Sequence, residues 1–214
     1  MSHASRRTIL AGAFALACAA PAARAADKLV DPKKVFSYLD AYMKLPAAER
    51  SRFKINYYLH IGPQPLTAPV WLVEGAKRTP IPLRADGRVE RLPTLAQLDS
   101  AKLQFGVDEG TKLGCTVGIE TMAPPAVEMD AREVALSLTQ AAAGVRKAAG
   151  IMAMAMPKLS QVSFPGAPSG EIVMADGKRA PMPLLKGVPS FNPTDFPAAR
   201  TLRFPKAPVK TDMG

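Results

Sequence analysis

The chain has 214 residues, of which 48% are hydrophobic and 21% charged, and its formal net charge is +10 at pH 7. This composition is typical of a folded, basic globular protein and excludes a disordered chain. No apolar run reaches the roughly 20 residues of a membrane-spanning helix, and two cysteines are too few for a disulfide scaffold, a zinc finger or an iron–sulfur cluster held by this chain alone.

The first 25 residues have the pattern of an export signal. Arg6 and Arg7 lead into Thr8-Ile9-Leu10 and an alanine-rich stretch that starts at Ala11. The run Ala23-Arg24-Ala25 then places small residues at the two positions that signal peptidase reads. This segment resembles a bacterial twin-arginine export signal, although Ala11 stands where such signals usually have lysine.

The resemblance implies a periplasmic protein from which residues 1–25 are cleaved near Ala25. The sequence disfavours two other interpretations, a buried N-terminal helix and a lipoprotein anchored through Cys18. Paired arginines begin the segment, and Ala15 stands in place of the leucine of a lipoprotein signal. Cleavage would leave Cys115 as the one remaining thiol, which cannot form a disulfide within the chain. We expect no transmembrane span in the mature chain.

The mature chain begins with a predicted helix and a predicted strand. Apolar side chains at helical spacing predict a helix over residues 31–45, with Asp31 as its N-cap. Residues 46–52 are expected to form a further short turn. From 53 to 61, apolar and polar side chains alternate, which predicts a strand with one face in the core.

A hairpin is predicted next, and it has a counterpart later in the chain. Strands at 69–73 and 79–83 flank Glu74-Gly75-Ala76, and Asp176-Gly177 occupies the matching later turn. The second strands of the two hairpins carry the prolines Pro80 and Pro82, and Pro181 and Pro183. Since proline cannot donate a ladder hydrogen bond, both second strands are predicted to lie at sheet edges.

Three further elements complete the secondary-structure prediction. Strands are expected at 101–107 and 113–121, where apolar residues are dense. A long helix is expected over 130–155, because an apolar stripe there suits packing against a sheet or another helix. The stripe consists of Val134, Leu138, Ala141, Val145, Ala148 and Met152.

A sequence repeat relates the two halves of the mature chain. Residues 70–83 match residues 171–184 at a spacing of 101, and five of the seven positions in K-R-x-P-x-P-L are identical. Two further matches occur at a spacing of 99: residues 102–105 with 201–204, and Asp31 with Asp130. Self-similarity at a fixed spacing indicates a repeated structural unit.

These patterns predict an α+β fold made by tandem duplication of a helix plus an antiparallel β-sheet. The first unit would span residues 26–125 and the second residues 126–214, and the two would pack through their sheets or through the long helix. The alternative is a pair of small β-sandwich-like domains joined by that helix.

Two side chains could serve an enzyme of unrecognised type. His60 is the one histidine outside the predicted signal, so any catalytic triad would depend on it. The alternation of its strand places it on the polar face, which favours a solvated residue. Cys115 falls on the apolar face of the strand at 113–121, which favours a small buried side chain over a nucleophile.

Metal and cofactor chemistry has little support in the sequence. Met152, Met154 and Met156 form M-x-M-x-M, and thioethers suit Cu(I), so a periplasmic copper-binding protein is a second alternative. Methionines at a helix end are, however, typical core fillers. No phosphate-binding loop, H-E-x-x-H or G-x-S-x-G motif occurs. We expect no cofactor and no metal, and the sequence favours a protein that is not an enzyme.

Basic pairs recur beside the two predicted hairpin turns, and they are the candidate ligand-binding residues. The pairs are Lys77 with Arg78 and Lys178 with Arg179. In a periplasm they would attract phospholipid head groups or acidic glycans, with peripheral membrane contact. Aromatic residues make up only 6% of the chain, which disfavours nucleic acid as a partner.

A groove between two duplicated halves would suit an apolar or acyl ligand. The sequence therefore predicts an exported, non-enzymatic binding or structural protein of the cell envelope. Its ligand would be an apolar small molecule or an anionic lipid or glycan.

Overall fold

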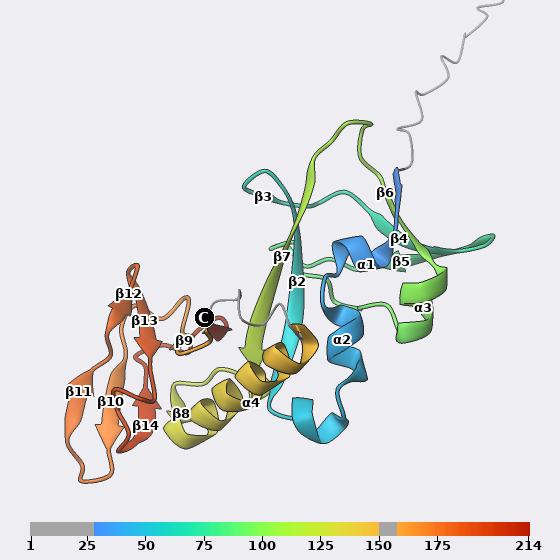
Figure 1. Cartoon of the computed structure of the whole chain (residues 1–214). Helices are drawn as coiled ribbons and strands as arrows, with labels where there is room; N and C mark the ends of the chain where they lie inside the picture. Colours follow the sequence, from blue (N-terminus) through green and yellow to red (C-terminus); the bar gives the residue numbers. More distant parts are fainter. Residues whose placement is uncertain (1–27, 150–157) are drawn as a thin grey trace, which may run out of the picture.

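The structure is a computed structural model that describes residues 28–149 and 158–214 (Figure 1). Four antiparallel sheets and several helices make a mixed α+β fold, as the sequence predicts. In chain order, the first half contains β1 (Lys28–Val30), α1 (Pro32–Val35), α2 (Leu39–Lys44), the 3-10 helix η1 (Ala47–Arg50), β2 (Phe53–Ile61), β3 (Gln64–Pro65), β4 (Val70–Glu74), β5 (Lys77–Ile81), α3 (Leu95–Ser100), β6 (Lys102–Phe105) and β7 (Leu113–Thr121).

The second half has one long helix followed by short strands. Its elements are β8 (Glu128–Asp130), α4 (Ala131–Ala149), β9 (Val162–Ser163), β10 (Glu171–Met174), β11 (Arg179–Pro181), β12 (Leu184–Leu185), β13 (Val188–Phe191), β14 (Ala199–Arg203) and β15 (Asp212–Met213). The predicted strands β2 and β7 have the bounds that the alternation of their side chains indicates.

The predicted helix over 31–45 is instead two short helices, α1 and α2. They are separated at Tyr38, whose φ of 67° lies outside the helical region. The break leaves the carbonyl of Ser37 without a helical partner, and the hydroxyl of Tyr57 donates a hydrogen bond to it at 2.6 Å. It also turns Phe36 into the core, where its ring centroid lies 5.1 Å from that of Tyr57.

The prediction omitted α3. This helix begins at Thr94, whose hydroxyl accepts a hydrogen bond from the N–H of Gln97, while the Gln97 side chain accepts one from the N–H of Thr94. Such a capping box is a local sequence signal. Hydrophobic spacing over six residues is too short to show a helical period.

Two of the four sheets have the same strand order. It is β1-β6-β4-β5 in the first half and β8-β14-β10-β11 in the second. At the centre of the first sheet Leu103 of β6 faces Leu72 of β4, and at the centre of the second Leu202 of β14 faces Ile172 of β10. Leu72 and Ile172 are 100 positions apart, one fewer than the sequence match indicates, because the second hairpin turn is one residue longer.

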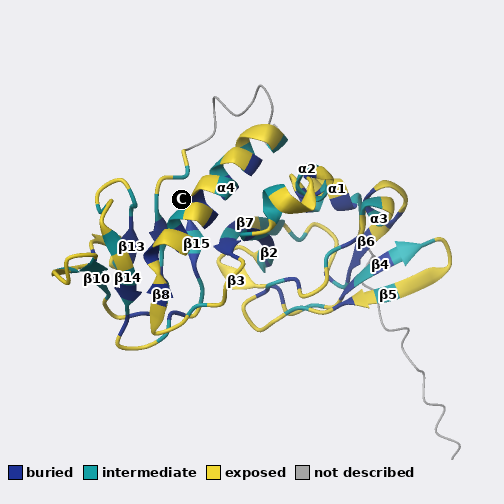
Figure 2. Cartoon of the chain, turned by 90° about the horizontal axis from the view of Figure 1, so that it is seen from below, coloured by how far each residue is buried: buried dark blue, intermediate teal, exposed yellow. Residues whose placement is uncertain are grey.

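Proline marks one edge of each of these sheets. β5 contains Pro80 and β11 contains Pro181, and each strand is the outermost of its sheet, which confirms the predicted edge positions. Without an N–H group, these residues prevent the ladder from extending to another strand. The two sheets lie at opposite ends of the molecule (Figures 1 and 2).

The centre of the molecule is formed by β2 and β7 (Figure 1). β2 and β7 pair over nine residues, and β3 extends that sheet on the far side of β2. β15 lies against β7, where the hydroxyl of Thr211 accepts a hydrogen bond from the N–H of Thr121 at 2.9 Å. β15 belongs to the sheet β12-β13-β9-β15, so this contact joins the two halves.

Helix α4 packs against both halves rather than only connecting them. It contacts β8 and β14 of its own half, and also α2, η1, β2 and β7. The side chain of Gln140 accepts a hydrogen bond from the N–H of Arg52 at 2.7 Å and donates one to the carbonyl of Ala48 at 2.8 Å. The buried apolar side chains consequently form one cluster drawn from both halves.

The predicted amphipathic character of α4 explains this position. Val134, Leu138 and Ala141 of the stripe are buried, and Figure 2 shows the opposite side of the helix exposed. The carboxylate of Asp130 caps its first turn, accepting hydrogen bonds from two backbone N–H groups. Among the described residues, no helix combines the length and the apolar character needed to cross a membrane.

Candidate functional site

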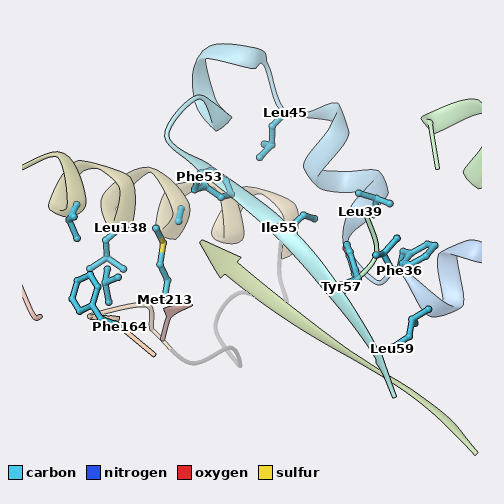
Figure 3. Packing of buried hydrophobic residues seen from close by; sticks show 14 of the residues in the cluster. Phe36, Leu39, Leu45, Phe53, Ile55, Tyr57, Leu59, Leu138, Phe164 and Met213 are labelled. Atoms are coloured by element: carbon cyan, nitrogen blue, oxygen red, sulfur yellow. The ribbon is translucent and has the colours of Figure 1, made fainter. Parts of the chain in front are cut away.

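An apolar cavity of about 200 Å³ lies where α2, α4, β2, β7 and β15 meet. Figure 3 shows Phe53 and Ile55 on β2 beside Leu45, with Met213 reaching in from the C-terminal strand. The full lining is Tyr38, Tyr42, Leu45, Phe53, Ile55, Val117, Ile119, Gly144, Val145, Ala148 and Met213. No lining side chain carries a charge, so the cavity favours an apolar group over an ion.

Strand alternation and one glycine build the walls of this cavity. Ile55 pairs with Ile119 across β2 and β7, so both side chains leave the sheet on the same face. Gly144 lets α4 approach that face, because a Cβ atom on it would lie 2.8 Å from Cζ of Phe53. Larger residues at this point of α4 would push the helix away from the sheet.

The rim of the cavity reaches solvent. Tyr38 is 54% exposed and Val117 is 36% exposed, whereas Met213 on the inner side is buried. The hydroxyl of Tyr42 donates to the carbonyl of Phe53 at 3.2 Å, which leaves its ring as part of the apolar wall. Pockets for drug-sized ligands are typically about 300–1,000 Å³. This cavity therefore suits one short apolar chain or ring rather than a whole large molecule.

Sequence reasoning anticipated an apolar groove between the halves but not the residues that line it. Phe53 and Ile55 lie on the predicted apolar face of β2, and Val145 and Ala148 belong to the predicted stripe of α4, so these parts of the lining have a local signal. Met213 and Tyr38 carry none, because their place in the wall depends on packing between segments far apart in the chain.

The opposite face of β2 and β7 holds a buried polar cluster. Glu120 is 4% exposed, and its carboxylate accepts a hydrogen bond from the hydroxyl of Tyr58 at 2.8 Å. The Lys54 ammonium and the Arg88 guanidinium lie 3.7 and 3.8 Å from this carboxylate. Arg88 also donates to the side-chain oxygen of Asn56 at 2.7 Å. The two cations offset the charge of a carboxylate that would otherwise be costly to bury.

His60 and Cys115 do not form a catalytic pair. His60 pairs with Gly114 and Cys115 with Leu59, so the two side chains leave the sheet on opposite faces. The ring nitrogens of His60 lie 2.8 Å from the carbonyl of Gly62 and 3.2 Å from the hydroxyl of Thr116. Burial raises the pKa of the Cys115 thiol to about 11, which suppresses the thiolate form.

The two basic hairpins lie at opposite ends of the molecule and do not form one surface (Figure 1). Lys178 pairs with Asp176 at 2.9 Å, and Arg179 lies 3.5 Å from Glu171. In the first hairpin the Arg78 guanidinium instead stacks on the ring of Trp71, at 4.2 Å from its centroid. The equivalent basic pairs therefore have different surroundings.

The candidate copper ligands of the second alternative, Met152, Met154 and Met156, lie outside the described residues. Within residues 28–149 and 158–214, no three His, Cys, Asp or Glu side chains gather as a metal site would require. No protein family, curated protein or solved structure matches the chain. The function therefore has to be argued from the geometry of the cavity and of the surfaces around it.

Proposed function

We propose that this is an exported, non-enzymatic binding protein of the cell envelope, whose ligand inserts an apolar group into the cavity between α2, α4 and the β2–β7 pair. The observation that carries this proposal is a solvent-accessible, uncharged cavity at the junction of the two halves. A short acyl chain or a small apolar ring fits its size and its lining.

Three features support a binding role over catalysis. The cavity walls hold no charged side chain that could act as acid, base or nucleophile. His60 and Cys115 leave the sheet on opposite faces, and neither ring nitrogen of His60 contacts a carboxylate among the described residues. The sequence also lacks the motifs of the common catalytic and cofactor-binding sites.

We propose further that the mature chain is a tandem duplication, with units near 26–125 and 126–214. In support, Val30 pairs with Leu103 in the first sheet as Met129 pairs with Leu202 in the second, each 99 positions apart. Asp31 and Asp130 then cap the helices that follow. A crystal structure tests this proposal: the four strands of one outer sheet should superpose on those of the other in the same order and register.

Ligand binding is tested with dansyl-undecanoic acid, whose fluorescence rises in apolar surroundings. Ala148→Phe places a ring in the cavity and should weaken binding by about tenfold or more, which corresponds to about 1.4 kcal/mol. Ala143→Phe makes the same change at an exposed position of the same helix and should bind like the unchanged protein. Equal binding by all three proteins, or no binding by any, would overturn the proposal.

The ligand itself is sought by native mass spectrometry of protein purified from its own periplasm. An adduct of acyl-chain size that is present in the unchanged protein and absent from Ala148→Phe would identify the occupant. Export is tested by replacing Arg6 and Arg7 with lysine, with Arg24→Lys as the control. The double change should retain the precursor in the cytoplasm, whereas the control should yield a mature chain that begins near Ala26.

A further inference from the structure

The outer face of the sheet β1-β6-β4-β5 carries a row of side chains unlike its counterpart in the second half. Trp71 of β4 pairs directly with Gln104 of β6 and with Pro80 of β5, and Gln104 pairs with Leu29 of β1. Leu103, the neighbour of Gln104, is buried in the core, so this row faces away from the core. The row therefore crosses all four strands on the face that the helices leave uncovered.

Trp71 holds a cation in a fixed orientation on this face. The Arg78 guanidinium lies 4.2 Å from the centroid of the Trp71 ring, and it makes no ion pair or hydrogen bond with another described residue. An arginine stacked on an aromatic ring keeps its N–H groups at the edge of the stack, where they can donate two parallel hydrogen bonds to a carboxylate. Arg78 is thus oriented for an anion that none of the described residues supplies.

Gln104 adds an unpaired polar group beside this cation. Its side chain is 7% exposed, and its amide oxygen Oε1 is buried without a hydrogen-bond partner. Burying such a group unpaired is unfavourable, so an exogenous hydrogen-bond partner would stabilise it. A hydroxyl group can donate or accept, and it therefore suits the amide in either of its two orientations. Leu29, the residue that pairs with Gln104 on β1, is 58% exposed.

In the sheet β8-β14-β10-β11, the cationic side chains at the matching positions form ion pairs with carboxylates of the adjacent strands. Arg203 occupies the place of Gln104, between Glu128 and Glu171 of the adjacent strands. Nε of Arg203 forms an ion pair with Glu128 at 2.9 Å that lacks hydrogen-bond geometry, and Arg179 lies 3.5 Å from Glu171. Only the first of the two sheets thus presents a cation and an amide that lack partners among the described residues.

We propose that the outer face of β1-β6-β4-β5 binds an acidic saccharide through Trp71, Arg78 and Gln104. The carboxylate of the sugar binds the guanidinium edge of Arg78, and a ring hydroxyl binds the amide of Gln104. Four strands spaced by about 4.8 Å give a flat surface long enough for two or three sugar rings. This site shares no residue with the lining of the apolar cavity, so a test of one proposal does not decide the other.

Charge favours a saccharide over a membrane surface. Polybasic lipid-binding segments typically carry about 4–8 lysines and arginines. On this face the cationic side chains come from Lys102 of β6 and Arg78 of β5, each of which pairs with Val73 of β4. Two cations are enough for a uronic acid but too few to hold the protein at an anionic bilayer.

Trp71 is the one tryptophan of the chain, and its fluorescence reports directly on this site. The mature protein is titrated with trigalacturonic acid, with the neutral trisaccharide maltotriose, and with vesicles of phosphatidylglycerol. We expect saturable quenching or enhancement with trigalacturonic acid and no change with maltotriose. No response to trigalacturonic acid, an equal response to maltotriose, or a response to the vesicles alone would overturn the proposal.

Matched variants locate the site within the fold. Arg78→Gln should weaken binding of trigalacturonic acid by about tenfold or more, since a charge-assisted contact is lost, whereas Arg179→Gln at the equivalent place of the second sheet should leave it unchanged. Calorimetry measures the affinity, because removing Arg78 also alters the starting fluorescence of Trp71. Gln104→Leu should weaken binding while keeping the fold, as judged by circular dichroism. Equal affinity of Arg78→Gln and Arg179→Gln would contradict the assignment.

Discussion

At the scale of single residues, Glu120 is the buried carboxylate around which the polar cluster of the β2–β7 pair is built. Its carboxylate is buried on the face of the β2–β7 pair that points away from the cavity, and its hydrogen-bond donor is Tyr58. Lys54 and Arg88 supply the compensating charge from a distance of nearly 4 Å. Removing the Glu120 carboxylate leaves the Tyr58 hydroxyl without its acceptor and the two partly buried cations without the charge that they offset. Breaking such a network on one side is destabilising.

Glu120→Leu should therefore lower the free energy of unfolding by about 2–3 kcal/mol. Glu120→Gln should cost less, because the amide oxygen can still accept the hydrogen bond from Tyr58. Urea denaturation measures both. The control is Glu90→Leu, since Glu90 is exposed in its pair with Arg84 and its loss should change stability by about 0.5 kcal/mol or less. Equal losses at positions 90 and 120 would contradict this account.

Asp212 makes stability depend on pH. Burial raises its pKa, Lys210 opposes the rise, and Glu120 adds to it. A pKa that is higher in the folded than in the unfolded chain means that the folded state binds the proton more tightly. The resulting stabilisation is complete below the unfolded pKa of about 4 and is lost as the pH rises through the folded pKa.

Asp212→Asn should consequently raise the urea midpoint at neutral pH and change it little at about pH 3, where the aspartate is mostly protonated in both the folded and the unfolded state. The exposed Asp195 provides the control, and Asp195→Asn should not show this difference between the two pH values. A gain for Asp212→Asn that is the same at both pH values would exclude ionisation as the cause.

At the scale of elements, α4 is positioned by contacts outside its own half. Its stripe packs on β2 and β7, and Gly144 sets the closest approach, with a Cβ contact of 2.8 Å to Phe53 and 3.3 Å to Leu45. Glycine in a helix interior costs about 1 kcal/mol relative to alanine when packing is neutral. Here packing decides the sign, because a Cβ atom on residue 144 would lie 2.8 Å from Cζ of the buried Phe53 ring, closer than two carbon atoms normally approach.

Gly144→Ala should therefore destabilise the protein by about 1–3 kcal/mol, although alanine is the better helix former. Phe53→Leu in the same chain should recover part of the loss, since it removes the atoms that the new methyl group meets. The four proteins of this double-mutant cycle are compared by thermal unfolding. A stabilised Gly144→Ala would show that α4 does not lie this close to β2.

At the scale of the whole molecule, the two halves share one apolar core. Helix α4 belongs to the second half but packs against β2 of the first half. Met213 of β15 likewise lines the apolar cavity, whose other walls come largely from the first half. Neither half therefore buries its apolar surface alone. Such coupling favours a single cooperative transition over independent unfolding of two units.

Unfolding in urea should accordingly give the same midpoint by Trp71 fluorescence, which reports on the first half, and by circular dichroism, which reports on both. Leu72→Ala and Ile172→Ala remove equivalent core side chains from the two outer sheets, and each should cost about 2–5 kcal/mol. Both variants should shift both signals together. If Ile172→Ala moved the dichroism signal and left the Trp71 transition in place, the halves would be independent.

Local sequence patterns were sufficient for much of this fold. Side-chain alternation gave the bounds of β2 and β7, and proline placed β5 and β11 at sheet edges. These predictions succeed because strand faces and missing N–H donors depend on neighbouring residues alone. The same alternation places His60 and Cys115 on opposite faces.

Only the tertiary structure decided where the halves meet and what they enclose. At the break near Tyr38, the carbonyl of Ser37 accepts a hydrogen bond from the hydroxyl of Tyr57, which lies on β2. The cavity joins Val117 and Met213, which are far apart in the chain. Such arrangements are set by packing between distant segments, for which a single sequence carries no local periodic signal.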